Sequence, residues 1–201
     1  MKTGIMGGTF NPIHNAHLMI ASFAKEEFRL DRILFMTSGN PPHKKGKKLV
    51  DAQLRHQMMQ AAIAGNPDFI AEDYEVRRGE YSYKAETLHF LKQKYPEDQL
   101  YFIIGGDSLR DLPTWYRPEE ILNLATILAF ARSFDFDMGQ AIHTAQEKCG
   151  GEIFQVHAPV MEFSSSLIRS RIAQGKSVRY LLPDAVLEMI RKYHLYEEEM
   201  L

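Results

Sequence analysis

The sequence predicts an α/β fold in which helices cover both faces of a doubly wound parallel sheet, giving three layers. Short apolar runs alternate with segments of helical period along most of the 201 residues. An alternation of strand and helix of this kind implies parallel pairing and right-handed crossovers. Polar clusters follow several of the apolar runs, at the carboxyl ends of the expected strands, where such a sheet binds its ligands.

The first half of the chain supplies three of the expected strands. Residues 5–6 end at a pair of glycines, and residues 32–36 and 69–71 are the next two apolar runs. A helix is expected from Asn15, where apolar residues recur at helical spacing, and a second helix is capped by Asp51. The apolar residues expected to share one face of this second helix are Leu54, Met58, Ala61 and Ala62.

The second half of the chain continues the alternation. Residues 83–95 have helical period, and residues 100–104 and 126–131 are apolar runs typical of buried strands. Two glycines after Cys149 end one helix, and Pro183 opens the last one.

Length and composition predict one domain. Residues 1–201 can form one well-buried core, with a small helical C-terminal part from about residue 164. Hydrophobic residues make up 45% and charged residues 25%, and the formal net charge of −2 does not favour nucleic acid as a partner. The lysine-rich loop at residues 44–48 also lacks the interleaved aromatics of an RNA-binding module.

Cysteine content and hydropathy bear on the compartment. The single cysteine, Cys149, excludes an intrachain disulfide and fits a reducing environment. No apolar stretch is long enough for a signal peptide or a membrane span. We therefore expect a cytoplasmic protein without a membrane partner, and the sequence leaves open whether it forms a homo-oligomer.

Two glycines and two histidines make the first candidate site. Gly7 and Gly8 let the backbone approach a ligand, and the helix from Asn15 directs its free amides into the same space. His14 and His17 project from one side if the first helical turn includes both, so that each can donate to a phosphate oxygen. The alternatives are that one histidine caps the helix while the other packs, or a zinc site, for which no third ligand is obvious.

A serine-rich segment makes the second candidate site. Ser164, Ser165 and Ser166 precede an apolar pair and have the pattern of a helix N-terminus, where hydroxyls and amides converge on an anion. Arg169 follows one turn later and can bind phosphate oxygens in a bidentate manner. We therefore expect a second phosphate pocket, with simple helix capping as the alternative.

These two segments resemble the signatures of a known superfamily. Residues 7–17 resemble the His-x-Gly-His signature of the nucleotidyltransferases, and residues 164–169 resemble their second signature, Ile-Ser-Ser-Thr-x-Ile-Arg. Together with SGNPPHK and IIGGDSLRDLPTWYRPEEIL, the similarity covers nearly the whole chain and is to the bacterial nicotinate mononucleotide adenylyltransferases. Three positions differ from the family pattern: Ala16 replaces a glycine, Phe163 an isoleucine, and Lys84 a threonine that reads the substrate's carboxylate.

The resemblance implies a Rossmann-like nucleotidyltransferase fold and a reaction of NAD synthesis. The adenylyl group of ATP passes to nicotinate mononucleotide, giving nicotinate adenine dinucleotide and pyrophosphate, with magnesium carried by the ATP phosphates and no protein-bound metal. Such a transfer needs no protein nucleophile, because the acceptor phosphate is already ionised, but it needs donors that hold two anions in line.

The site residues follow from the matched motifs. The expected catalytic residues are His14, His17, Lys44 and Arg169. The residues expected around ATP are Gly7, Gly8, Thr9, Phe10, Gly105, Asp107, Arg132, Ser164 and Ser165. The residues expected to bind the acceptor are Lys84, Thr114 and Trp115.

Several of these residues have a second interpretation. Trp115 stacks on the pyridine ring or plugs the space beneath its loop, while backbone amides near Thr114 and Trp115, together with the Lys84 side chain, pair with the carboxylate. Asp107 binds the ribose or a magnesium-bound water, or only caps a loop. Arg132 lies over the adenine or pairs on the surface.

Two other functions share these signatures or this fold. Phosphopantetheine adenylyltransferases have both signatures, but they are typically shorter and lack the loop with Trp115. A non-catalytic nucleotide sensor could lose the charge-stabilising donors, whereas this chain retains all four expected catalytic residues. ATP and nicotinate mononucleotide are therefore the expected partners.

Overall fold

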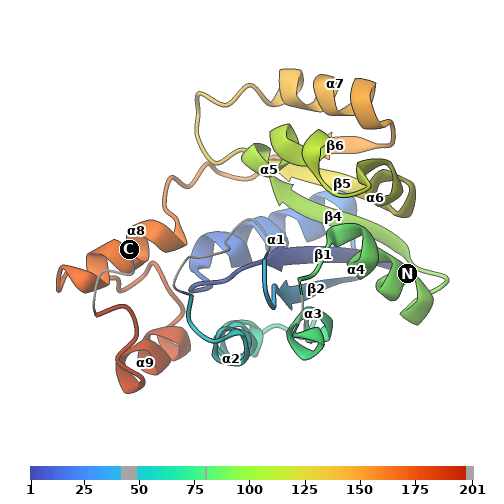
Figure 1. Ribbon diagram of the computed structural model, residues 1–201. Coiled ribbons are helices and arrows are strands. Elements are labelled where there is room, and N and C mark those ends of the chain that lie inside the picture. The colour runs from blue at the N-terminus through green and yellow to red at the C-terminus, as the bar shows by residue number, and fades with distance from the viewer. Residues whose placement is uncertain (42–48, 80, 198–201) are drawn as a thin grey trace. The chain divides into compact units, whose positions relative to one another are not determined.

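The computed structural model describes residues 1–41, 49–79 and 81–197 (Figure 1). Its strands form one six-stranded sheet in the order β3-β2-β1-β4-β5-β6. The strands are β1 (Lys2–Gly8), β2 (Arg32–Thr37), β3 (Phe69–Glu72), β4 (Gln99–Gly105), β5 (Ala125–Phe130) and β6 (Ile153–Gln155).

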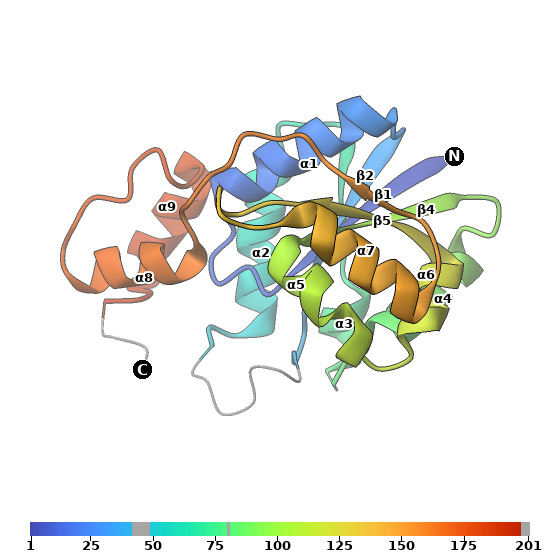
Figure 2. The same ribbon diagram turned by 90° about the horizontal axis from the view of Figure 1, so that it is seen from above.

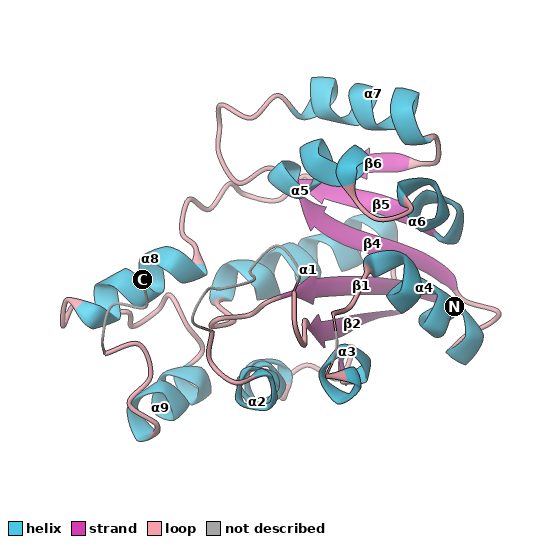
Figure 3. Ribbon diagram, viewed as in Figure 1, coloured by secondary structure: helices cyan, strands magenta, loops and turns pink. Residues whose placement is uncertain are grey.

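Helices connect the strands throughout (Figure 3). Those of the first half are α1 (Asn15–Phe28), α2 (Ala52–Ile63), α3 (Tyr74–Arg78) and α4 (Lys84–Lys94). Those of the second half are α5 (Gly106–Asp111), the 3-10 helix η2 (Leu112–Thr114), α6 (Pro118–Leu124), α7 (Met138–Cys149), α8 (Ser165–Ala173) and α9 (Asp184–Lys192). In these described ranges every helix is too short or too polar to cross a membrane.

The central strands pair in parallel. Strand β1 pairs with β4, with Lys2 opposite Gln99, and β4 pairs with β5, which in turn pairs with β6. Helices lie on both sides of the sheet (Figure 2). The predicted doubly wound α/β fold is therefore confirmed.

Contacts divide the chain into two compact units. Unit 1 consists of Met1–Gly7, Met19–Leu34 and Tyr83–Glu162. Unit 2 consists of Gly8–Leu18, Phe35–Ser82 and Phe163–Leu201. Helices α8 and α9, which correspond to the expected helical part near residue 164, belong to unit 2.

Unit 1 has an aliphatic core. Ile5, Ile103, Ile127 and Leu128 on its central strands are all buried, as expected for strands covered on both faces. Helix α4 packs against α6, and α5 packs against α7 (Figure 2).

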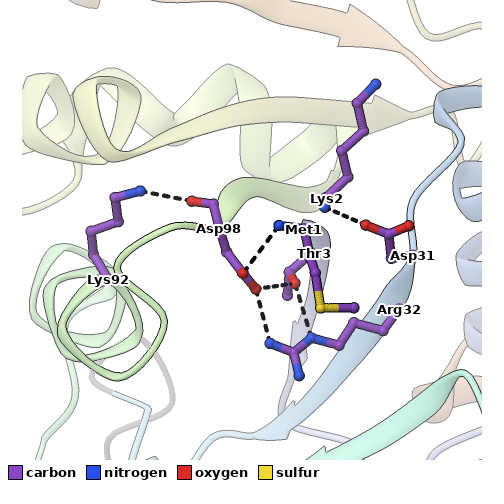
Figure 4. A network of polar contacts seen from close by, with 7 residues as sticks. All are labelled: Met1, Lys2, Thr3, Asp31, Arg32, Lys92 and Asp98. Atoms are coloured by element: carbon purple, nitrogen blue, oxygen red, sulfur yellow. Dashed lines mark hydrogen bonds and ion pairs between the residues drawn. The ribbon is translucent and has the colours of Figure 1, made fainter.

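A polar network closes the amino-terminal end of β1 in unit 1 (Figure 4). The Asp98 carboxylate accepts hydrogen bonds from the Thr3 hydroxyl (2.6 Å), the Arg32 guanidinium (2.9 Å) and the Met1 α-amino group (3.3 Å). The Lys92 ammonium donates to the Asp98 carbonyl at 2.7 Å. Burial alone would raise the pKa of the Asp98 carboxyl, but these donors outweigh it and lower that pKa below its ordinary value.

Unit 2 has an aromatic core. The Phe35 ring lies between those of Phe10 and Phe69, with centroid distances of 6.2 Å and 4.9 Å. Met58 and Met59 of α2 are fully buried, and α2 packs against α9.

The start of α2 is as predicted, but its buried face is not. The Asp51 carboxylate accepts from the amides of Gln53 (2.9 Å) and Leu54 (3.2 Å), so this cap is confirmed. Of the four residues predicted to share the buried face only Met58 is buried, and the side chains that α2 buries are Arg55, His56, Met58, Met59 and Ile63. The prediction was wrong because an arginine that donates four hydrogen bonds to carbonyl oxygens can occupy the buried face.

Most other predicted elements agree with the structure to within two residues. The helix stop after Cys149 is confirmed, because Gly150 caps α7 with a left-handed φ of 71°. Helices α3, α5 and α6 and strand β6 were not predicted, because segments of five, six, seven and three residues are too short to show a period.

Candidate active site

The two histidines lie where β1 leads into α1, within unit 2. His14 is buried just before α1 and His17 is in its first turn, and their rings stack with centroids 3.7 Å apart. The His14 amide donates to His17 Nδ1 at 3.2 Å. Because Nδ1 accepts this bond, the proton of the neutral His17 ring lies on Nε2, which can donate to an anion. His17 thus combines the capping role considered as an alternative with a donor for phosphate.

Phe10 supports this pair. A Cβ added at Gly8 would lie 2.6 Å from the Phe10 ring, so the space that glycine leaves open is filled by this side chain. Phe10 is buried and stands edge-on to His17, with centroids 5.1 Å apart. Gly8 and Phe10 therefore support the histidine pair, and their expected contact with ATP stays a prediction.

Helix α8 is tied to the same loop of unit 2. The Arg169 guanidinium donates from Nη1 to the Asn11 carbonyl at 2.9 Å, and the Ser165 hydroxyl donates to the Pro12 carbonyl at 2.8 Å. The second Arg169 nitrogen, Nη2, lies 3.4 Å from the Ser166 hydroxyl. The structure thus brings the two predicted phosphate-binding segments together on one loop.

The residue that precedes the cap of α8 contacts one of the two histidines. The Phe163 ring lies 5.4 Å from that of His14, centroid to centroid. The Ser164 hydroxyl accepts from the Leu167 amide at 3.3 Å, so this serine caps α8. For Ser164 the structure realises the capping alternative.

A buried arginine of α2 also bonds to the loop that follows β1. Arg55 donates to the carbonyls of Thr9 (2.6 Å), Ser38 (2.8 Å), Gly39 (3.0 Å) and Val50 (2.8 Å). Its guanidinium therefore joins the loops that follow β1 and β2 to the start of α2. The sequence analysis did not assign this residue a role.

The electrostatics of this loop are unusual. Within the ranges that the structure describes, neither Arg55 nor Arg169 bonds to a carboxylate, and all their partners are carbonyl or hydroxyl oxygens. Burial lowers the pKa of both guanidinium groups, but an arginine stays protonated in proteins. Among the described residues these two positive charges have no hydrogen-bonded protein anion, although the Asp51 carboxylate lies within electrostatic range of Arg55.

The predicted ATP-binding residues of unit 1 also come together. Arg132 Nη1 lies 3.3 Å from the Asp107 carboxylate, and both side chains are about half exposed (54% and 51%), so other groups can reach them. A Cβ added at Gly105 would lie 2.6 Å from Asp107 Oδ1 and 2.8 Å from Arg132 Nε. Glycine at the N-cap of α5 therefore leaves room for this pair, whose flexible side chains would have to shift around a larger residue.

The predicted acceptor residues meet at the end of β1 in unit 1. A Cβ added at Gly7 would lie 3.7 Å from the Lys84 ammonium nitrogen and 3.5 Å from the Phe102 ring. Phe102 in turn lies edge-on to Trp115, with centroids 6.4 Å apart. The Lys84 ammonium group and the rings of Phe102 and Trp115 are thus gathered near the end of β1. A positive charge beside aromatic rings is suited to binding a negatively charged ring compound.

The turn that carries Thr114 uses its own polar groups. The Trp115 amide donates to the Leu112 carbonyl at 3.0 Å, and the Thr114 hydroxyl donates to the Asp111 carbonyl at 2.7 Å. The expectation that the Trp115 amide reads a carboxylate is therefore not met, because this amide is already bonded within η2. Lys84 is the predicted acceptor residue whose charge suits that task.

The remaining predictions for the site concern Lys44 and a protein-bound metal. Lys44 lies in residues 42–48, outside the described residues. Among the residues that are described, no three His, Cys, Asp or Glu side chains gather in a group that could hold a metal ion.

The sequence analysis also missed Asn11 and Tyr196. The Tyr196 hydroxyl donates to Asn11 Oδ1 at 3.0 Å, across 185 positions of sequence. No local pattern predicts such a bond. For Arg55 a signal was present, because it stands four residues before Met59 and eight before Ile63, in line with apolar side chains.

Comparison with known proteins agrees with this geometry. The model of the family described as cytidylyltransferase-like matches residues 5–171. A protein from Lachnoclostridium phytofermentans, named "Probable nicotinate-nucleotide adenylyltransferase", is 43% identical over 97% of this chain and 98% of its own length. A protein of the same name from Lactiplantibacillus plantarum is 41% identical over 98% of this chain and 89% of its own length.

A solved structure shows the same fold. The nicotinic acid mononucleotide adenylyltransferase of Plasmodium falciparum, complexed with NaAD, superimposes with a TM-score of 0.80 at 20% identity, and the match covers the whole of both chains. The family model and the curated relatives each span most of this sequence. This chain therefore belongs to the cytidylyltransferase-like family and, within it, to the nicotinate-nucleotide adenylyltransferases.

Proposed function

We propose that this protein transfers the adenylyl group of MgATP to nicotinate mononucleotide, giving nicotinate adenine dinucleotide and pyrophosphate. The observation that carries the proposal is the loop of residues 9–12 in unit 2. It joins the His14–His17 pair to α8, and the guanidinium groups of the buried Arg55 and the half-buried Arg169 donate to it, with no carboxylate bonded to either group among the described residues. A triphosphate supplies the negative charge that this loop lacks.

The chemistry requires no covalent intermediate. An oxygen of the acceptor phosphate attacks the α-phosphorus of ATP, and the bond from that phosphorus to the bridging oxygen breaks as pyrophosphate leaves. His17 Nε2–H donates to the α-phosphate while charge grows on it, and His14 stacks against this ring and fixes its orientation. Arg169 and the N-terminus of α8 neutralise the leaving pyrophosphate. Lys44 is included in the proposal as a further donor.

The rest of both substrates is assigned to residues of unit 1. The Asp107 carboxylate accepts hydrogen bonds from the ATP ribose hydroxyls, with Arg132 alongside it. Trp115 stacks on the pyridine ring, and the Lys84 ammonium pairs with the ring carboxylate. Magnesium arrives as part of the MgATP substrate. The proposal places the reaction in the cytoplasm, which the single, free Cys149 favours.

An assay of pyrophosphate release tests the proposal. The purified protein is given MgATP with nicotinate mononucleotide, nicotinamide mononucleotide or phosphopantetheine, each in turn, and the dinucleotide product is identified by mass. We expect rapid turnover with the nicotinate compound, much slower turnover with the amide and none with phosphopantetheine. Turnover of phosphopantetheine, or nucleotide binding with no turnover of any acceptor, would show that one of the two alternative functions is correct.

A further inference from the structure

We infer that Tyr196 is a positioning residue for the adenylyl transfer, acting on Arg169 through Asn11. This inference rests on the proposed function and adds to it a residue distant in sequence from both signatures. Tyr196 follows α9 by four positions and is buried, at 4% exposure.

The Tyr196 hydroxyl bonds to the loop that carries the site. It donates to Asn11 Oδ1 at 3.0 Å, in a contact buried from solvent. The same oxygen accepts a longer bond of 3.4 Å from the Val50 amide. Asn11 Nδ2 is buried and has no hydrogen-bond partner among the described residues, so the orientation of this amide depends on the bonds to its oxygen.

Asn11 connects this bond to the proposed chemistry. Its side chain accepts from Tyr196, and its main-chain carbonyl accepts from Arg169 Nη1 at 2.9 Å. A change in the Asn11 amide therefore moves the oxygen on which the Arg169 guanidinium is aligned. Misalignment of a charged donor weakens an interaction that matters most in the transition state.

The charges around Tyr196 agree with this position. Burial raises the pKa of the Tyr196 hydroxyl, while the positive charges of Arg169 and Arg55 act in the opposite direction. Burial is the larger effect, so the hydroxyl stays protonated and remains a donor. The buried Arg55 and the half-buried Arg169 therefore both lie within electrostatic range of this one hydroxyl.

The backbone supports a specific role for this contact. The chain after α9 places two residues with side chains in the left-handed region, His194 with φ 50° and Tyr196 with φ 66°. Residues other than glycine adopt this region at a cost in energy, and such conformations persist where surrounding contacts hold them. The buried Tyr196 ring and its hydrogen bond provide that anchor.

The variant Tyr196→Phe tests the inference, because it removes only the hydroxyl. We expect kcat with MgATP and nicotinate mononucleotide to fall about tenfold, with KM for ATP changed less than threefold. Tyr193→Phe is the matched control, since this tyrosine ends α9 and its ring is 44% exposed. Its kcat should stay within a factor of about 1.5 of the wild type. Rates are normalised to the folded fraction at the assay temperature.

A double-mutant cycle separates positioning from general stability. If Tyr196 acts through Asn11, adding Tyr196→Phe to Asn11→Ala causes no further loss of kcat. Independent, multiplying losses would contradict the inference. So would a normalised kcat of Tyr196→Phe within twofold of the wild type.

Pyrophosphate binding, measured by calorimetry, gives a readout that needs no acceptor. Free pyrophosphate carries the charge that Arg169 is proposed to neutralise, so Tyr196→Phe should weaken its binding about fivefold, and Tyr193→Phe should not. A wild type that binds pyrophosphate but turns over no acceptor contradicts the proposed function alone. A Tyr196→Phe variant that binds pyrophosphate like the wild type contradicts the positioning inference alone.

Discussion

The two ends of β1 both bury polar groups that are joined across long stretches of sequence, but their charges are treated in opposite ways. At the amino-terminal end, the negative charge of Asp98 meets the positive charges of Arg32 and the Met1 amine (Figure 4). In the loop that follows the carboxyl-terminal end, the hydrogen bonds of Arg55 and Arg169 go to neutral oxygens within the described part of the chain, and Asp51 acts on Arg55 only through space.

This difference separates a structural cluster from a binding one. Burying a charge is costly unless it is paired, so a paired charge needs no further explanation, whereas an unpaired buried charge does. In the ranges that the structure describes, the cations of the loop after β1 bond to no carboxylate, and under the proposed function the ATP polyphosphate supplies an anion for the half-buried Arg169. The Asp98 network needs no ligand, because its buried carboxylate is already paired with cations of the protein.

The largest effect is expected from removing the cation that holds the loop. Arg55→Ala should lower the free energy of unfolding by about 3–5 kcal/mol, because it leaves four carbonyls without their buried donor. Chemical denaturation measures this loss. Arg110→Ala is the control, since Arg110 is 69% exposed and should change stability by less than about 0.5 kcal/mol. A loss below about 1 kcal/mol for Arg55→Ala would show that these bonds contribute little.

The next effect concerns catalysis at the same loop. His17→Ala should cost about 2–4 kcal/mol of transition-state stabilisation, read from kcat, because it removes a donor aimed at developing charge. KM for ATP should change much less. His157→Ala, which alters an exposed histidine paired with Glu27, should leave both constants unchanged. Equal losses in kcat and in ATP affinity would instead make His17 a ground-state binding residue.

The stability that the Asp98 network gives to the amino-terminal end of β1 should depend on pH and should not depend on substrate. Asp98→Asn should lower the free energy of unfolding by about 2 kcal/mol near neutral pH, since it removes a charged acceptor of three hydrogen bonds. The pKa of Asp98 is lowered by folding, so its stabilisation is present above the ordinary value of 3.8 and is lost as pH falls through the lower folded value. Denaturation curves of both proteins should therefore converge in acid. A constant difference down to about pH 2 would contradict the ion-pair account.

Much of the fold could be predicted because its signals are local. The apolar runs of β1, β2, β4 and β5 are long enough to show their type, and the caps at Asp51 and Gly150 depend on neighbouring residues alone. Strand β6 has three residues, and no period can be counted over that length.

The candidate site was predictable only in part, for a physical reason. The residues of both signatures have a chemistry that can be read from type and spacing. The residues that hold these signatures in place cannot be identified from type and spacing. Arg55 bonds to main-chain carbonyls, which every residue possesses, and Tyr196 contacts Asn11 only in the folded chain. Likewise, the Trp115 amide looked available until the structure showed its bond to Leu112.

A cation of unit 1 tests whether a single positive charge selects the acceptor. Lys84 occupies the position expected to read the acceptor's carboxylate, next to Gly7 and the Phe102 ring. Lys84→Met keeps the length of the side chain but removes its charge. The preference for nicotinate over nicotinamide mononucleotide, measured as the ratio of kcat/KM values, should therefore fall about tenfold, or ~1.4 kcal/mol.

Lys148→Met, on the exposed surface of α7, serves as the matched control and should leave that preference unchanged. A preference retained by Lys84→Met would mean that backbone amides read the carboxylate without the ammonium group. In that case the cations of the loop after β1 would serve ATP alone, and the choice of acceptor would depend on the shape of the aromatic site around Trp115.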